Sequence, residues 1–129
     1  MNSAESNFLA WLRKADHDLL NIDNNLAAKE IPWDTICFHA QQAVEKVLKA
    51  FLVHQGSGLS KTPDLVALLA QCVAHDANLS ALETDCRKLT SYGVAARYPD
   101  DLFEPCEVDG RDVVAAAYRV REKILLLLP

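Results

Sequence analysis

The segment from Trp33 to His54 constrains the fold more than any other part of the chain. At about 100° per residue, its apolar side chains gather in one wide sector of a helix. An apolar sector this wide is typical of a helix that packs on more than one side. We therefore predict a central helix that its neighbours cover. The sector contains Ile36, Cys37, Ala40, Ala43, Val44, Val47, Leu48, Ala50 and Phe51.

Four other segments carry apolar residues at helical spacing. The first begins at Phe8 and should expose its acidic side chains, including Asp18, to solvent. Thr62 is the expected N-cap of the third helix, because the following Pro63 suits a first helical turn. A fourth helix follows, and a last one starts at about Asp109. The apolar residues that define these helices are Phe8, Leu12, Ala15, Leu19, Ile22, Leu26, Leu65, Leu68, Leu69, Cys72, Val73, Leu82, Cys86, Leu89, Val113, Ala117, Val120, Ile124 and Leu127.

The pattern as a whole favours helices over strands. No segment shows the period-2 alternation of a half-buried β-strand, and no internal repeat is present. Short connections make successive helices neighbours. The sequence therefore predicts an all-α fold, an antiparallel up-and-down bundle of four to five helices, with four long helices and one shorter one. A chain of this length is usually one domain, so residues 1–129 are expected to form a single domain.

Composition and charge exclude several classes of protein. Half of the residues are hydrophobic, which argues against disorder, and the formal net charge of −5 gives no global attraction for DNA. The four cysteines lie far apart and lack zinc-site spacing, so we expect free thiols, no metal and no cofactor. The N-terminus lacks the features of a signal peptide, and the apolar tail is too short to cross a bilayer. A cytoplasmic protein is therefore expected.

The polar side of the central helix carries a strip of four residues, His39, Gln42, Lys46 and Lys49, which we call the polar strip. Lys49 stands four residues after Glu45, in the order that favours a surface ion pair. A solvated face is the simplest interpretation of the polar strip. The alternative is a binding site for a ligand or a partner.

Three further residues of this helix do not fit a fully solvated polar side. Gln41 lies at the margin of the apolar sector, so its amide needs a hydrogen-bond partner from another helix or a second subunit if it is buried. Phe38 and Val53 interrupt the polar side with apolar side chains. We therefore expect that a partner partly covers this side of the helix.

Four stretches of the chain, in order, resemble the HEPN domain family, small helical domains often found beside minimal nucleotidyltransferases. They are WLRKADHDL in the first helix, QQAVEKVLKAFL in the central helix, KTPDLVALL in the third and YGVAARYPD at the end of the fourth. Together they cover most of residues 8 to 125. The resemblance implies an up-and-down helical bundle that is commonly a homodimer.

The resemblance also implies a choice between two functions. Some family members are ribonucleases, many of them toxins, whose active site is an Arg followed within a few residues by a His. Others lack that motif and are taken to bind a nucleotide or a nucleotidyltransferase chain. In this sequence no histidine follows Arg97, and the last histidine is His75. The ribonuclease motif is therefore absent.

Arg97 and the adjacent Tyr98 are the strongest site candidates. In the simplest interpretation, Arg97 binds the last carbonyls of the fourth helix or an acidic neighbour such as Asp100, and Tyr98 packs its ring. In the functional interpretation, Arg97 binds a phosphate or a partner carboxylate at a dimer cleft, because its planar guanidinium suits both.

The expected function is that of a non-catalytic HEPN-type module that binds a nucleotidyltransferase partner, a nucleotide or both, as a homodimer. The alternative is a divergent ribonuclease or toxin that uses Arg97, and a third possibility is a purely structural dimerisation module. The candidate residues for binding a ligand or partner are Arg97, Tyr98, His39, Gln42, Lys46 and Lys49.

Overall fold

The computed structural model describes residues 7–58, 60–93 and 105–129, and within these ranges it is helical without any strand. The all-α prediction is confirmed. A short 3₁₀ helix, Ala77–Leu82, precedes the fourth α-helix. The α-helices are α1 (Phe8–Leu26), α2 (Trp33–His54), α3 (Leu65–Val73), α4 (Glu83–Gly93) and α5 (Glu107–Leu125).

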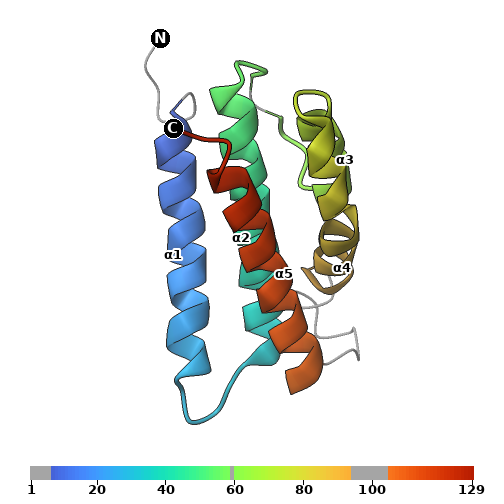
Figure 1. Ribbon diagram of the computed structural model, residues 1–129. Coiled ribbons are helices and arrows are strands. Elements are labelled where there is room, and N and C mark those ends of the chain that lie inside the picture. The colour runs from blue at the N-terminus through green and yellow to red at the C-terminus, as the bar shows by residue number, and fades with distance from the viewer. Residues whose placement is uncertain (1–6, 59, 94–104) are drawn as a thin grey trace.

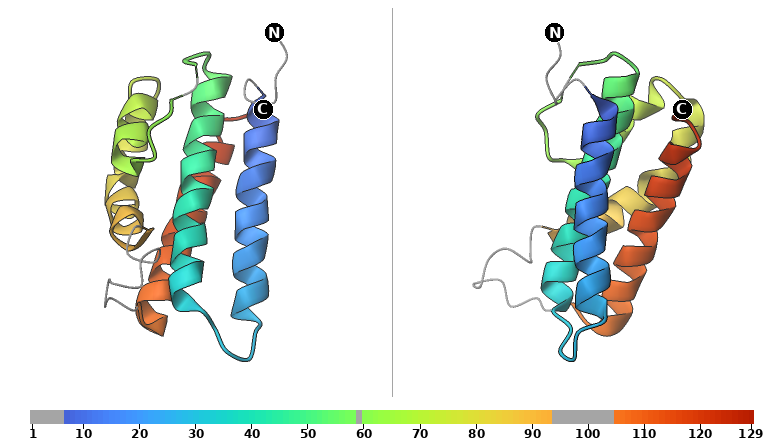
Figure 2. Two further views of the ribbon diagram at one scale, coloured as in Figure 1. Left: turned by 180° about the vertical axis from the view of Figure 1, so that it is seen from behind. Right: turned by 90° about the vertical axis from the view of Figure 1, so that its left-hand side faces the viewer.

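The helices form four columns that run alternately down and up (Figures 1 and 2). Helix α1 runs antiparallel to α2, and α5 returns parallel to α2. The descending column that follows α2 and precedes α5 in the chain consists of α3 and α4 together. These two helices are short, with 9 and 11 residues, so the prediction of four long helices was wrong in this respect. Two short helices and the 3₁₀ turn between them take the place of one long helix.

Helix α2 is the centre of the bundle, and it contacts α1, α3, α4 and α5. Its bounds match the predicted ones, and its apolar sector is buried on more than one side. Phe51 and Leu48 belong to the largest fully buried side chains of the described chain. Burying such side chains contributes about 2 kcal/mol each, which makes this helix the main source of hydrophobic stabilisation.

The start of α3 differs from the prediction by two residues. The N-cap is Asp64, whose carboxylate accepts hydrogen bonds from the backbone N–H groups of Val66 at 3.0 Å and Ala67 at 3.3 Å. Thr62 instead accepts from the backbone N–H of Asp64 at 3.2 Å. The residue before a proline is held in an extended conformation, so Thr62 stays outside the helix. Asp is also a somewhat stronger N-cap than Thr.

Helix α5 packs tightly against the first residue of α2 at Gly110. A Cβ atom at this position would lie 2.3 Å from Cε3 of Trp33, the first residue of α2. The guanidinium of the next residue, Arg111, lies 5.2 Å from the centre of the same indole. Only a glycine allows the two helices to come this close.

Over the described residues, no helix is long and apolar enough to cross a membrane.

Candidate functional site

Asp18 on α1 makes the central contact of the polar strip. Its Oδ1 lies 2.9 Å from Nδ1 of His39, and its Oδ2 lies 2.6 Å from Nζ of Lys46. We call these three residues the Asp18 cluster. Asp18 is only 8% exposed, so the prediction that this acid is solvated was wrong. The physical reason is that α1 lies along the polar side of α2, where two cationic or hydrogen-bonding groups compensate the burial of the carboxylate.

Lys49 is the most buried member of the polar strip, with an exposure of 7%. Its ammonium lies 2.9 Å from Oε2 of Glu45, so the predicted ion pair is present. It also lies 5.7 Å from the centre of the Trp11 ring on α1, within the range of a cation–π contact. Helix α1 therefore covers this end of the polar strip as well.

The two glutamines of α2 connect the strip to the segment before α3. Gln42 donates from Nε2 to Oε1 of Gln41 at 2.9 Å. Gln41 in turn donates from Nε2 to the carbonyl oxygen of Pro63 at 3.4 Å. The amide that appeared to need another helix or a second subunit is therefore satisfied within the chain.

The structure brings four of the six candidate residues together on one side of α2. His39 and Lys46 keep about a quarter of their side chains exposed, at 24% and 25%. Arg97 and Tyr98 lie outside the described residues, so their place in a site remains a prediction. Asp18 is paired with Lys46, and Glu45 is paired with Lys49. The two carboxylates therefore balance the charges of the two lysines of the polar strip when His39 is uncharged.

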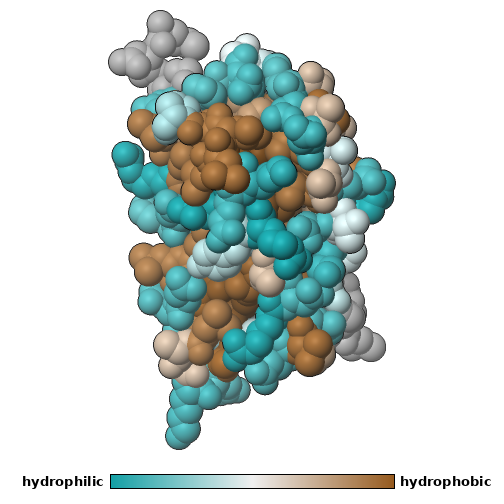
Figure 3. All heavy atoms as spheres, in the orientation of Figure 1, coloured by the Kyte–Doolittle hydropathy of each residue, from teal (hydrophilic) through white to brown (hydrophobic). Residues whose placement is uncertain are grey.

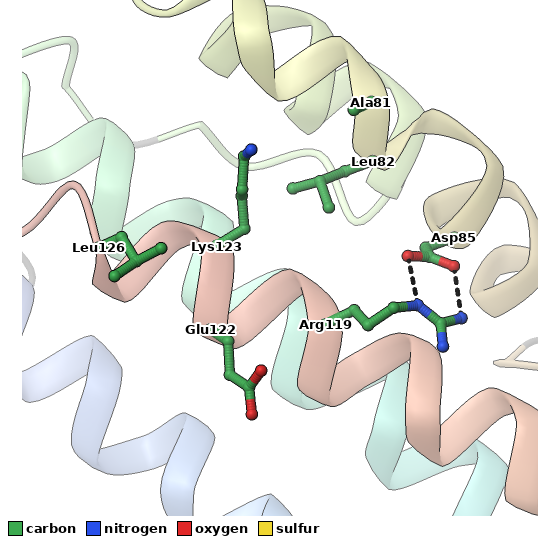
Figure 4. Close-up of a pocket in the computed structure, with 7 residues that line it drawn as sticks. All are labelled: Ala81, Leu82, Asp85, Arg119, Glu122, Lys123 and Leu126. Atoms are coloured by element: carbon green, nitrogen blue, oxygen red, sulfur yellow. Dashed lines mark hydrogen bonds and ion pairs between the residues drawn. The ribbon is translucent and has the colours of Figure 1, made fainter.

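A hollow of about 370 Å³ lies on the other side of the bundle, between α5 and the segment made of the 3₁₀ helix and α4 (Figure 4). Arg119 reaches across it to Asp85, with Nε to Oδ2 at 3.1 Å and Nη2 to Oδ1 at 2.8 Å. These hydrogen bonds raise the pKa of the Arg119 guanidinium. The residues that line the hollow are Ala81, Leu82, Asp85, Arg119, Glu122, Lys123 and Leu126.

Sequence reasoning missed this hollow. Asp85 and Arg119 are 34 residues apart, so no local spacing indicates that they meet. The bidentate pair uses the carboxylate of Asp85 and much of the guanidinium of Arg119 for the fold, and it leaves Lys123 as the cation of the hollow without a described ion pair.

The cysteines are free thiols, as expected, and most of them are chemically quiet. Burial raises the pKa of Cys37, Cys72 and Cys86 from 9.0 to about 12. A thiol with so high a pKa has almost no nucleophilic thiolate at neutral pH. Only Cys106, at the N-cap of α5, is exposed. Among the described residues, no three His, Cys, Asp or Glu side chains form a possible metal site.

Two further histidines, His54 and His75, have structural contacts at the end of the bundle where α2 terminates. His54 packs edge-on against Phe8 with ring centres 4.8 Å apart. His75 forms a hydrogen bond with the Ser57 hydroxyl, and its ring lies 6.2 Å from that of Phe51. These contacts fasten α1 and α3 to the end of α2.

Comparison with known proteins places the chain in a family. Residues 8–128 match the HEPN domain. Among solved structures, the fold is similar to the crystal structure of TT1696 from Thermus thermophilus, with a TM-score of 0.80 and 23% sequence identity. That similarity covers 94% of this chain and 98% of the other, and at this identity it shows the fold alone. A search of curated proteins gives no match. Since the HEPN match extends over nearly all of the chain, this protein belongs to the HEPN domain family.

Proposed function

We propose that this chain is a non-catalytic HEPN-type module that acts as a homodimer and binds a nucleotidyltransferase partner, a nucleotide or both. The observation that carries the proposal is the absence of any histidine after Arg97 in the sequence. Ribonuclease chemistry needs a group that takes the 2′-hydroxyl proton and a cation that stabilises the phosphate. Arg97 is a candidate for the second role, and no histidine follows it in the sequence for the first.

The contacts of the polar strip favour a protein over a nucleotide as its ligand. A phosphate would have to compete with Asp18 for His39 and Lys46, and with Glu45 for Lys49. The carboxylates already neutralise these cations, so the strip offers little net positive charge to a phosphate. A partner chain with polar and apolar groups can instead contact the exposed quarter of the His39 and Lys46 side chains. Arg97 and Tyr98 are the proposed nucleotide contacts.

The direct test is affinity purification of the tagged protein from its native host. We expect a nucleotidyltransferase chain in the eluate. In parallel, ATP, GTP, CTP and UTP are each added to the purified protein and the melting temperature is recorded. A nucleotide at 100 times its dissociation constant should stabilise the fold by about 2.7 kcal/mol. If no nucleotidyltransferase is recovered and no nucleotide shifts the melting temperature, the proposal fails.

A cleavage assay separates this proposal from the ribonuclease alternative. The wild-type protein and the Arg97→Ala variant are incubated with a mixed-sequence RNA, and fragments are resolved on a gel. The proposal expects no cleavage by either protein. Cleavage that disappears in the variant would establish the alternative.

A further inference from the structure

Two ion pairs close the seam between α4 and α5 on one side of the hollow. Nζ of Lys88 lies 2.7 Å from Oδ2 of Asp112, and Asp85 binds Arg119 through two hydrogen bonds. On α5 the two positions are seven residues apart, which brings them to the same side of the helix. The next position in this series is Leu126, which lines the hollow and is 82% exposed. The seam is therefore open at this end.

The open end of the seam has an apolar surface. Leu82, at the end of the 3₁₀ helix, belongs to the hydrophobic core and forms part of the lining, and Ala81 lies beside it. Figure 4 shows Leu82 and Lys123 reaching into the space between the two walls. In Figure 3, hydrophobic side chains gather over the C-terminal end of α5, with hydrophilic side chains beside them. An apolar surface with a polar edge is typical of an interaction site.

The charged side chains of the hollow present cations to the outside. The side chain of Arg119 is 51% exposed and that of its partner Asp85 only 14%, so a molecule that enters the hollow meets the guanidinium before the carboxylate. The ammonium of Lys123 has no ion pair or hydrogen bond among the described residues. Figure 4 shows the carboxylate of Glu122, the other acid of the lining, pointing away from Leu82 and Asp85. The hollow therefore favours a negatively charged ligand, although the net charge of the protein is −5.

A phosphate or a nucleotide fits the hollow poorly. Such ligands are held by several convergent donors, commonly backbone N–H groups at the start of a helix. The wall formed by α5 is the second half of that helix, where the N–H groups belong to helical hydrogen bonds. Asp85 already accepts two hydrogen bonds from Arg119. A small anion would also leave the apolar surface of Leu126 uncovered.

A helix of a partner protein fits better, because it can use both the cations and the apolar surface. Arg119 and Lys123 are four residues apart on α5, so they stand about one turn, or about 6 Å, from each other. Acidic residues at positions i and i+4 of a second helix have the same spacing. Apolar side chains on the same side of that helix can then enter the hollow, as happens when an amphipathic helix lies in a groove.

We propose that the hollow between α4 and α5 docks an amphipathic helix of a partner protein. Two acidic side chains of that helix, one turn apart, bind Arg119 and Lys123, and an apolar side chain packs against Leu82 and Leu126. The hollow lies on the other side of the bundle from the polar strip, and its partner need not be a nucleotidyltransferase. The inference therefore goes beyond the proposed function and does not rest on it.

The first test uses two synthetic peptides of about 15 residues, a length at which a helix can form. Both carry leucines along one side. The acidic peptide adds two Glu residues one turn apart beside the leucines, and the control peptide has Lys at the same two places. Fluorescence anisotropy should show that the acidic peptide binds about tenfold more tightly than the control.

Variants of the protein locate the peptide. Lys123→Glu should weaken the acidic peptide about fivefold, because an attraction between exposed charges becomes a repulsion. Leu126→Ser should weaken it several-fold through the lost apolar contact. Lys14→Glu, on an exposed position of α1, is the matched charge reversal and should leave the dissociation constant unchanged. Circular dichroism establishes that each variant keeps its helices. Equal binding of the two peptides, or binding that is indifferent to Lys123→Glu and Leu126→Ser, overturns the inference.

The second test identifies the natural partner. The photoreactive residue benzoylphenylalanine replaces Leu126 in the full chain, which is produced in the native host and irradiated, and the crosslinked peptides are sequenced by mass spectrometry. The matched control carries the same residue in place of Ala70, on an exposed position of α3. We expect crosslinks from position 126, and not from position 70, to a helical segment with two acids one turn apart.

The outcomes separate this inference from the proposed function. A crosslink to a second copy of this chain, a crosslinked segment without such acids, or no crosslink at position 126 overturns the docking site. If a nucleotidyltransferase chain is recovered from the host but does not crosslink at position 126, the proposed function stands and the docking site fails. A different protein crosslinked through such a segment supports the docking site alone.

Discussion

Helix α2 has two unlike sides. On the side that faces α1, charged residues are buried: Asp18 and Lys49 are the buried charged residues of the described chain, and both lie in this seam. On the side that faces α3, α4 and α5, the buried groups are hydrocarbon, neutral thiols and the backbone of Gly110. The first seam depends on specific partners, because an unpaired buried charge is costly. The second depends on shape, because a dry core has no other means of selecting its neighbours.

The largest expected effect comes from deprotonating the buried thiols on the side of α2 that faces α3, α4 and α5. The pKa of Cys37, Cys72 and Cys86 is about 12 in the folded protein, against 9.0 ordinarily. The unfolded chain therefore releases these protons at lower pH than the folded one. The stabilisation is complete below pH 9.0 and is lost as the pH rises toward about 12. Each thiol contributes a slope of up to about 1.4 kcal/mol per pH unit.

Urea unfolding at a series of alkaline pH values measures this slope. In the Cys37→Ala variant, the free energy of unfolding should fall less steeply with pH, because one thiol fewer is deprotonated. The variant will be less stable than the wild type at neutral pH because the substitution leaves a cavity. A stability that stays constant above pH 9.0 would show that the thiols are not protected by burial.

The next prediction tests the packing between α2 and α5. Gly110→Ala places a Cβ atom against the Trp33 indole, and overpacking of this kind costs about 1 to 3 kcal/mol. The better helix propensity of Ala offsets about 1 kcal/mol of that cost. We expect a net loss of up to about 2 kcal/mol in the free energy of unfolding. Adding Trp33→Leu should recover part of the loss, and additive effects of the two substitutions would rule out the contact as the cause.

On the charged side, Asp18→Ala should destabilise the protein by about 2 kcal/mol, since it leaves Lys46 and His39 partly buried without their anion. Because Lys46 retains access to water, the loss should be smaller than the roughly 3 to 5 kcal/mol typical of a fully buried pair. In a double-mutant cycle, Asp18 and Lys46 should show a coupling of about 1 kcal/mol or more. A coupling near zero would mean that the cluster is solvated in solution.

The smallest effect is expected at a pair with equally good geometry in which the cation is exposed. Arg119 is 51% exposed, although it binds Asp85 through two hydrogen bonds. Arg119→Ala should therefore cost less than about 1 kcal/mol in urea unfolding. This variant calibrates the Asp18 experiment, since both remove one partner of an ion pair between helices. An effect as large as that of Asp18→Ala would show that burial does not determine how much these two ion pairs stabilise the fold.

Periodicity predicted the helices well because burial itself is periodic. The bounds of α2 match the predicted Trp33 and His54, and α5 begins two residues before the predicted Asp109. The burial of Asp18 could also have been recognised, since it stands on one stripe with Ala15 and Ile22. The expectation that an acid is solvated obscured that signal. Its buried position required only that a basic residue lie opposite.

Other features could not be predicted, since they depend on which segments meet. A glycine within a helical pattern, such as Gly110, suggests a close approach, but nothing in the local sequence identifies Trp33 as the neighbour. The same holds for Asp85 and Arg119. The contact of Gln41 with Pro63 was anticipated only as a need for a hydrogen-bond partner, which another helix or a second subunit could equally have met.

The two oxygens of Asp18 also determine how far along α2 the first helix sits. They bind residues 39 and 46, which stand seven positions, or two turns, apart on α2, so the carboxylate lies between them. A slide of α1 by one turn, about 5.4 Å, would separate it from at least one of these partners. Apolar contacts between smooth stripes tolerate such a slide far better. The carboxylate therefore acts as a register pin, selecting one axial alignment among several that hydrophobic packing alone would permit.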